Sequence, residues 1–259
     1  MENLTPFVTV VCGVLGLVIG SFLNVVIWRV PRKESVVAPR SKCPTCDTPI
    51  SNRDNIPVVS WLALRGKCRT CAATISARYP LVEFATGMLF AAIGARYAHS
   101  WALPAYLVLG AALIAISAID VEHYIIPNRI VYPVGFALVP LFALAALLGH
   151  DWHAFERALL GALAAFGVLL VIHLISPGGM GFGDVRLCFL LGLALGWLGW
   201  PEVYFGLLAG FMYGSVIGVT LMALRVLKRG EHLPFGPFLA AGAITIVLLG
   251  APVLHFAPR

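Results

Sequence analysis

Two carboxylates stand at the edges of long apolar runs, where a charged side chain is costly and points to a function. Asp120 closes the run in "AISAIDVEHYIIPN", and Asp184 follows "GMGFG". Two carboxyl groups held close together cannot both ionise, so one keeps a proton while the other acts as a base. Such a pair can activate a water to attack a peptide carbonyl, while the protonated partner polarises the carbonyl oxygen. We therefore expect Asp120 and Asp184 to be catalytic.

The stretch "GGMGFGDVRL" (178–187) places glycines directly before Asp184. Glycine permits positive φ and lets a substrate backbone approach closely, so Gly181 and Gly183 are predicted to form a substrate loop. The dipole of the helix that follows favours a charged Asp184. Each acid alone has a structural alternative, because Asp184 could be an N-cap and Asp120 an interfacial residue. The pair together favours the functional interpretation.

Four cysteines follow the pattern C-x2-C-x21-C-x2-C, in "CPTC" (43–46) and "CRTC" (68–71). Paired thiolates at this spacing typically close a tetrahedral zinc site, here made by Cys43, Cys46, Cys68 and Cys71. Disulfides are the alternative, but they are disfavoured in a reducing cytoplasmic loop. Four thiolates leave no open position, so the zinc would be structural. The other two cysteines, Cys12 and Cys188, lie in apolar runs and are expected to be core residues.

The elements that must position these groups are predicted to be membrane helices. The chain has 259 residues, of which 60% are hydrophobic and 12% charged, with a mean hydropathy of +0.92. A soluble protein carries about a quarter charged residues. Segments near the roughly 20 residues that a bilayer core requires occur at 7–28, 82–98, 102–120, 130–149, 156–175, 185–200, 203–224 and 236–256.

The basic residues predict how these helices are oriented. Of the 18 Lys and Arg residues, ten lie in 29–80 and five in the alternate loops near 129, 186 and 225–229. Three remain on the other side: Arg96, Arg157 and Arg259. This bias puts the 29–80 loop in the cytoplasm and both termini outside. It also explains the net charge of +6 as an orientation signal and a contact with anionic lipid rather than a nucleic-acid surface.

These observations predict an all-α polytopic membrane protein of about eight transmembrane helices with a small cytoplasmic zinc-knuckle insert. Its parts are a first helix (1–28), a zinc-binding loop with the four cysteines (29–80) and a seven-helix core (81–259). The loop has few large apolar side chains, so it needs a metal to fold. Asp120 and Asp184 are then both at cytoplasmic helix ends, at a similar depth, where they can meet.

The ordered motifs resemble those of the prepilin peptidases, the type IV leader peptidase family of membrane aspartic proteases. The resemblance covers nearly the whole chain. Its motifs are "GSFLNVVIWRVP" (20–31), the two Cys knuckles, "IPVVSWLALRGKCRTC" (56–71), "ISARYPLVE" (75–83), "IDVEHYIIPN" (119–128), "GMGFGDVRL" (179–187) and "LPFGPFLA" (233–240). The G-x-G-D element alone also fits presenilin-like proteases, whereas the Cys-bearing loop and "GSFLN" narrow the match to the bacterial enzymes.

The resemblance implies an enzyme of the bacterial inner membrane that cuts the leader from type IV prepilins or type II secretion pseudopilins at the cytoplasmic face. The family's catalytic pair maps onto Asp120 and Asp184. Many members also N-methylate the new terminus with S-adenosylmethionine, and the Cys-bearing form is associated with these bifunctional enzymes. Asn24, Arg29 and Glu83 are the candidate cofactor-binding residues. Each has a structural alternative in helix packing, snorkelling or helix-start stabilisation.

Three other functions fit parts of the sequence. A proton-coupled transporter would explain paired acids in a bundle, but not the metal-stapled loop. A zinc-bearing scaffold would need neither acid, and a peptidase without methyltransferase activity would need no cofactor site. The "LPFGPF" turn (233–238) is expected either to line the site or simply to begin a helix with proline in its first turn.

Overall fold

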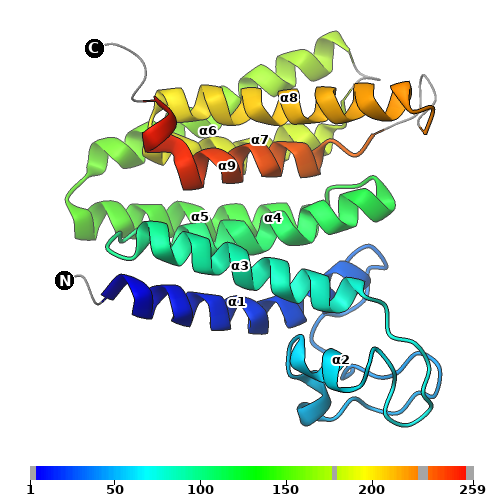
Figure 1. The fold of residues 1–259 in the computed structure, drawn as a ribbon. Coiled ribbons are helices and arrows are strands. Elements are labelled where there is room, and N and C mark those ends of the chain that lie inside the picture. The colour runs from blue at the N-terminus through cyan, green and yellow to red at the C-terminus, as the bar shows by residue number, and fades with distance from the viewer. Residues whose placement is uncertain (1–3, 177–179, 227–232, 255–259) are drawn as a thin grey trace. The chain divides into compact units, whose positions relative to one another are not determined.

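The computed structural model describes residues 4–176, 180–226 and 233–254 (Figure 1). In these ranges the regular structure is helical, and two isolated β-bridges are the strand-like pairings. The chain divides into two compact units, Met1–His99 and Ser100–Arg259. All of the predicted zinc and cofactor residues belong to the first unit, and both predicted catalytic acids belong to the second.

Two long helices, α1 (Leu4–Arg29) and α3 (Arg78–Tyr97), pack against each other in the first unit. Glycines allow this close approach. A Cβ on Gly16 would lie 2.7 Å from the Thr86 carbonyl oxygen, and one on Gly20 would lie 2.7 Å from the Cα of Glu83. Small residues at such spacings let helix backbones meet, as they commonly do in membranes. Between the two helices, the insert contains a short 3₁₀ helix, η1 (Asn52–Asn55), and α2 (Val59–Ala63).

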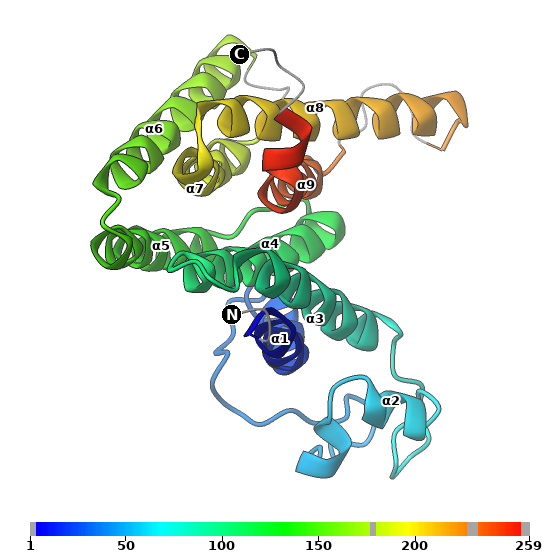
Figure 2. The same cartoon turned by 60° about the vertical axis from the view of Figure 1, so that its left-hand side comes forward.

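In the described part of the second unit the helices are α4 (Leu103–His123), α5 (Asn128–Gly149), α6 (Trp152–Ile175), α7 (Phe182–Leu198), α8 (Trp200–Ala223) and α9 (Gly236–Leu254). Figure 2 shows α7 with α6, α8 and α9 around it. Most of the residues from Asp184 to Gly196 are buried, so α7 is the core of this unit. The helix that carries Asp184 is therefore held on several sides.

The far end of α7 is anchored to α6. A Cβ on Gly192 would lie 2.4 Å from the carbonyl oxygen of Gly161, so these helices touch through their backbones. The guanidinium of Arg157 donates to the carbonyls of Gly196 (2.9 Å) and Trp197 (2.7 Å). The last carbonyls of a helix have no intrahelical partners, and a cation there also complements the helix dipole. Arg157 therefore caps α7.

Each of the eight predicted membrane segments coincides with a long helix, and five of these helices are long and apolar enough to cross a membrane: α1, α4, α5, α6 and α8. The fold class is thus confirmed, while the number of eight spans stays a prediction. The bounds of α4 and α7 differ from the predicted segments at the ends that carry the two acids. The structure continues α4 to His123 and begins α7 at Phe182, so Asp120 lies in the last turn of α4 and Asp184 in the first turn of α7 rather than at the terminal residues.

Candidate functional site

Asp120 is held in the last turn of α4, with only 5% of its surface exposed. The helix ends at Tyr124 in the left-handed conformation, and the Tyr124 N–H donates to the Asp120 carbonyl (2.8 Å). The Asp120 carboxylate is fixed from another element, because its Oδ2 accepts a hydrogen bond from the backbone N–H of Gly236 (3.0 Å) at the start of α9. One of its oxygens is therefore already bound and oriented.

Asp184 lies in the first turn of α7 and is 7% exposed. Its Oδ1 is buried and has no hydrogen-bond partner among the described residues. The side chain does not cap the helix, whose N-cap residue is Gly181. Ile126 lies against both Gly183, one residue before Asp184, and Gly236, whose N–H binds Asp120, so the structure brings the surroundings of the two carboxylates together from helices far apart in the sequence.

Gly181 and Gly183, before Asp184, leave room for neighbouring atoms where a side chain would stand. Gly181 has φ −70° and ψ 145°, an ordinary extended conformation, so the positive φ that glycine permits is not used at this residue. A Cβ on Gly181 would lie 3.3 Å from Asp184 Oδ2, and one on Gly183 would lie 2.9 Å from the Cβ of Ile126. Both glycines thus allow close approach. The preceding Gly178 and Gly179 lie outside the described residues.

Three residues on the segments around the pair were not predicted as site residues: Ile126, Gly236 and, through its contact with Arg186, Asn128. Ile126 lies against both Gly183 and Gly236, and the guanidinium of Arg186 donates to the side chain of Asn128. The available signals were the "IIPN" and "LPFGPF" turns, both noted in the sequence. The "LPFGPF" turn begins α9 at Gly236 with a proline next to it, as one of the two alternatives expected, and the Gly236 N–H also contacts Asp120.

The four predicted zinc cysteines form one cluster: Cys43, Cys46, Cys68 and Cys71 have ligand atoms within 4.8 Å of one another. The Sγ atoms of Cys43 and Cys71 are 3.8 Å apart. Zinc–sulfur bonds of about 2.3 Å in a tetrahedron place sulfurs about 3.8 Å apart, so the residues fit the metal. None of the four forms a disulfide, and the buried Cys12 and Cys188 are also free thiols.

The two knuckles repeat the same backbone pattern. A β-bridge joins Lys42 to Pro49 in the first and Lys67 to Thr74 in the second. In each knuckle, the backbone N–H of the first cysteine donates to the carbonyl of the residue five positions later. Cys43 donates to Thr48 (3.0 Å), and Cys68 donates to Ala73 (2.8 Å). Backbone N–H groups of Cys46 and Thr45 lower the pKa of the Cys43 thiol to about 6. Such a thiolate is prepared to bind metal.

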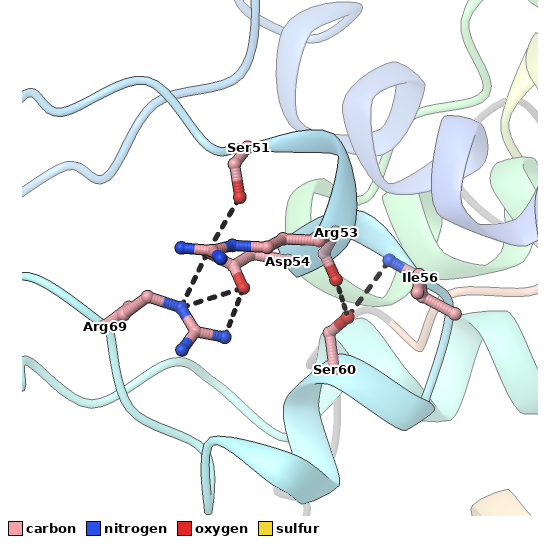
Figure 3. A network of polar contacts seen from close by, with 6 residues as sticks. All are labelled: Ser51, Arg53, Asp54, Ile56, Ser60 and Arg69. Atoms are coloured by element: carbon pink, nitrogen blue, oxygen red, sulfur yellow. Dashed lines mark hydrogen bonds and ion pairs between the residues drawn. The ribbon is translucent and has the colours of Figure 1, made fainter.

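The segment between the knuckles is tied to the second one by polar contacts (Figure 3). Arg69 donates to both carboxylate oxygens of Asp54, at 2.6–3.0 Å, and Ser51 donates to the same carboxylate. The hydrogen bond from Arg69 lowers the pKa of Asp54. Trp61 reaches further and donates from Nε1 to the Ile75 carbonyl (3.1 Å). The insert therefore has a defined structure around the cysteine cluster.

Asn24 and Glu83 both lie along the contact between α1 and α3. Asn24 is 3% exposed and donates to the carbonyls of Gly20 and Tyr79, while its buried Oδ1 has no partner among the described residues. Glu83, 8% exposed, accepts from the backbone N–H of Val58 (2.7 Å). Asn24 binds the Tyr79 carbonyl, and Tyr79 is one helical turn from Glu83 on α3. The candidates Asn24 and Glu83 therefore offer acceptor oxygens in the same buried region.

Val58 is in an unusual conformation, with φ 61° and ψ −50°, and the Val59 N–H donates to the Pro57 carbonyl (2.6 Å). This is a γ-turn, which is rare and strained at a β-branched residue. The Glu83 carboxylate stabilises the turn by accepting the Val58 N–H.

Arg29, the third candidate cofactor residue, contacts the loop that follows α1. Its guanidinium donates to the carbonyls of Ser35 (2.9 Å) and Pro39 (2.7 Å), just after α1. These contacts fix the first segment of the insert.

A polytopic helical membrane protein with paired buried carboxylates and a cysteine cluster is the class that this fold and site define. Residues 14–97 match the bacterial peptidase A24 N-terminal domain, and residues 107–223 match the type IV leader peptidase family. The chain belongs to the type IV leader peptidase family, which confirms the resemblance seen in the sequence.

Similar curated proteins cover nearly the full chain and bear the same name, prepilin leader peptidase/N-methyltransferase. One from Stutzerimonas stutzeri is 37% identical over 97% of this chain and 96% of its own length. One from Pseudomonas aeruginosa is 35% identical over 95% and 92%, and one from Bacillus subtilis is 37% identical over 94% and 95%. No solved structure matched the chain.

Proposed function

We propose that this protein is a membrane aspartic endopeptidase that removes the leader peptide of type IV prepilins or type II secretion pseudopilins. The observation that carries the proposal is the burial of two carboxylates, Asp120 and Asp184, beside glycines that both pack against Ile126, in a member of the leader peptidase family. The family and the names of the similar proteins support this activity.

The two carboxylates differ in their hydrogen-bond partners before substrate binds. Asp120 is oriented by the Gly236 N–H, whereas Asp184 Oδ1 has no partner among the described residues and is free to contact a water. One carboxylate takes a proton from this water as its oxygen bonds to the scissile carbonyl carbon. The other, protonated, donates a hydrogen bond to the carbonyl oxygen. When the C–N bond breaks, a proton passes to the leaving amine and both acids return to their shared-proton state.

The proposed orientation matches the substrate. With both termini outside and the 29–80 loop in the cytoplasm, Asp120 and Asp184 lie at the cytoplasmic side of a bacterial inner-membrane protein. A prepilin presents an apolar helix in the membrane and a basic leader in the cytosol, so its scissile bond is at this boundary. The basic loop would also contact anionic membrane lipid, and nothing in this arrangement calls for nucleic acid.

We propose zinc as a structural metal of the insert. Cys43, Cys46, Cys68 and Cys71 would hold it through four thiolates, and their spacing fits a closed tetrahedral site. The metal would fix both knuckles, and through the Asp54–Arg69 contact it would fix the segment between them.

We propose N-methylation of the new terminus as a second activity, supported by the names of the similar proteins. Bound S-adenosylmethionine would supply the methyl group. The Asn24 Oδ1, unpartnered among the described residues, and the Glu83 carboxylate would accept hydrogen bonds from its amino or ribose groups. Arg29 fits this role less well, because its guanidinium already binds two loop carbonyls. A peptidase without methyltransferase activity is the alternative.

Co-expression with a candidate prepilin, followed by mass spectrometry of the pilin N-terminus, tests both activities at once. Cleavage should occur in the wild type and be lost in Asp120→Asn and Asp184→Asn, and the added mass of one methyl group should report the second activity. Methylated product that disappears in Asn24→Ala or Glu83→Gln, while cleavage persists, would support the cofactor site. Unchanged cleavage in either aspartate variant would refute the peptidase proposal, and ion flux in liposomes would then favour a transporter.

A further inference from the structure

Position 236 is a glycine for a spatial reason. Its φ is not positive, since Gly66 is the described glycine with that property. An L-amino acid could therefore adopt its backbone conformation. A Cβ at this residue would, however, lie 2.8 Å from Asp120 Oδ2 and 3.2 Å from Ile126 Cδ1. The absence of a side chain makes room for the carboxylate that the Gly236 N–H binds.

Ile126 connects this contact to the other acid. Its Cβ lies 2.9 Å from where a Cβ of Gly183 would be, in the first turn of α7, one residue before Asp184. The same isoleucine thus packs against the start of α7 and the start of α9. It is half-buried and sits on the short connection between α4, which carries Asp120, and α5.

The connection itself is anchored. Asn128, the first residue of α5, accepts a hydrogen bond from Arg186 of α7, whose guanidinium stacks over the Phe182 ring at 4.5 Å. Ile126 is therefore held two residues from a fixed point, and cannot move without disturbing the first turn of α7. The beginnings of α5, α7 and α9 are joined around the two carboxylates.

We propose that Gly236 and Ile126 are positioning residues that together set the relative placement of the Asp120 and Asp184 carboxylates. Gly236 orients Asp120 through its N–H and leaves room for it. Ile126 fixes the distance between the start of α9, which holds Asp120, and the start of α7, which carries Asp184. This inference rests on the proposed peptidase function and adds two residues that act through the acids rather than on the substrate.

The test is Gly236→Ala, assayed by cleavage of a purified prepilin in detergent. Alanine suits a helix better than glycine does, so a purely structural role predicts unchanged or higher thermal stability and normal turnover. A positioning role predicts that kcat falls by roughly 100-fold, as for a displacement of about 1 Å, while KM and the melting temperature stay near wild type. Gly167→Ala in α6 is the matched control, because a Cβ there meets no described atom within 4 Å.

Rescue makes the test specific. Ile126→Val removes Cδ1, the atom 3.2 Å from the new methyl group, so Gly236→Ala/Ile126→Val should recover part of the lost kcat. Non-additivity of the two changes would demonstrate their coupling. If Gly236→Ala does not fold, Ile126→Ala should still lower kcat per folded molecule without changing KM.

Wild-type turnover in the folded Gly236→Ala variant, or in Ile126→Ala, would overturn the positioning role. An absence of cleavage by the wild type would instead contradict the proposed function.

Discussion

Replacement of Asp184 by asparagine should abolish cleavage and at the same time stabilise the fold. The wild-type side chain places a buried acceptor without a partner among the described residues next to a second carboxylate. Leaving a buried polar group unsatisfied costs about 1–3 kcal/mol. The asparagine amide donates to Asp120 without the need for the pair to hold a shared proton, so we expect a gain of about 1–2 kcal/mol.

Asp120→Asn is the matched comparison. Asp120 Oδ2 already accepts the Gly236 N–H, and the asparagine oxygen can keep this bond. The change therefore removes the need for a shared proton without satisfying an orphaned atom, and its stabilisation should be smaller. Both variants lose an acid–base group, which typically contributes about 10²–10⁴-fold to the rate.

Thermal unfolding in detergent, followed by tryptophan fluorescence, measures the difference. A stabilisation of about 1 kcal/mol raises the melting temperature of a protein of this size by about 2–4 °C, so Asp184→Asn should melt about 2–8 °C higher than wild type. A lower melting temperature for Asp184→Asn, or an equal rise for Asp120→Asn, would refute the argument that Asp184 is the unsatisfied member of the pair.

Three further predictions concern other parts of the fold. Purified protein should contain one zinc per chain by elemental analysis, and Cys43→Ser or a strong chelator should make the 41–75 segment sensitive to protease; metal-free protein with an intact insert would contradict the structural role. The Asp54–Arg69 contact lowers the pKa of Asp54, so it stabilises the insert above the unfolded pKa of about 3.9 and is lost as pH falls through the lower folded value. The difference in hydrogen exchange between wild type and Arg69→Gln should accordingly vanish at low pH, and a constant difference would argue against the ion pair. Gly192→Ala would place a Cβ 2.4 Å from a carbonyl oxygen of α6. Overpacking of this kind should lower the free energy of unfolding by about 1–3 kcal/mol and so lower the melting temperature. The same melting temperature as wild type would mean that the two helices separate freely.

The sequence predicted those features that depend on residue type and period. Long apolar runs located the helices, and the spacing of Cys43 to Cys71 located the cluster, because two knuckles impose a short local geometry. The sequence also predicts that Asp120 and Asp184 meet, because membrane helices have similar lengths and their ends lie at the same depth.

The remaining features depend on contacts between segments, which no local pattern encodes. Glu83 binds the N–H of Val58, 25 residues away, and Gly236 binds Asp120 across 116 residues. Arg29, a predicted cofactor residue, binds the carbonyls of Ser35 and Pro39, because the chain folds back after α1. The glycines before Asp184 suggested unusual dihedral angles, whereas Gly183 is required by the bulk of Ile126.

The two knuckles share a backbone pattern but not the same access to solvent. Cys43 is buried, Cys46 and Cys68 are intermediate, and Cys71 is exposed. With zinc bound, an oxidant or a competing chelator would therefore reach the sulfur of Cys71 first and open the chelate from the second knuckle. The buried thiolate of Cys43 would be the last to release the ion. Metal loss from this loop would then be stepwise and directional, beginning in the half that Arg69 and Trp61 connect to the intervening segment.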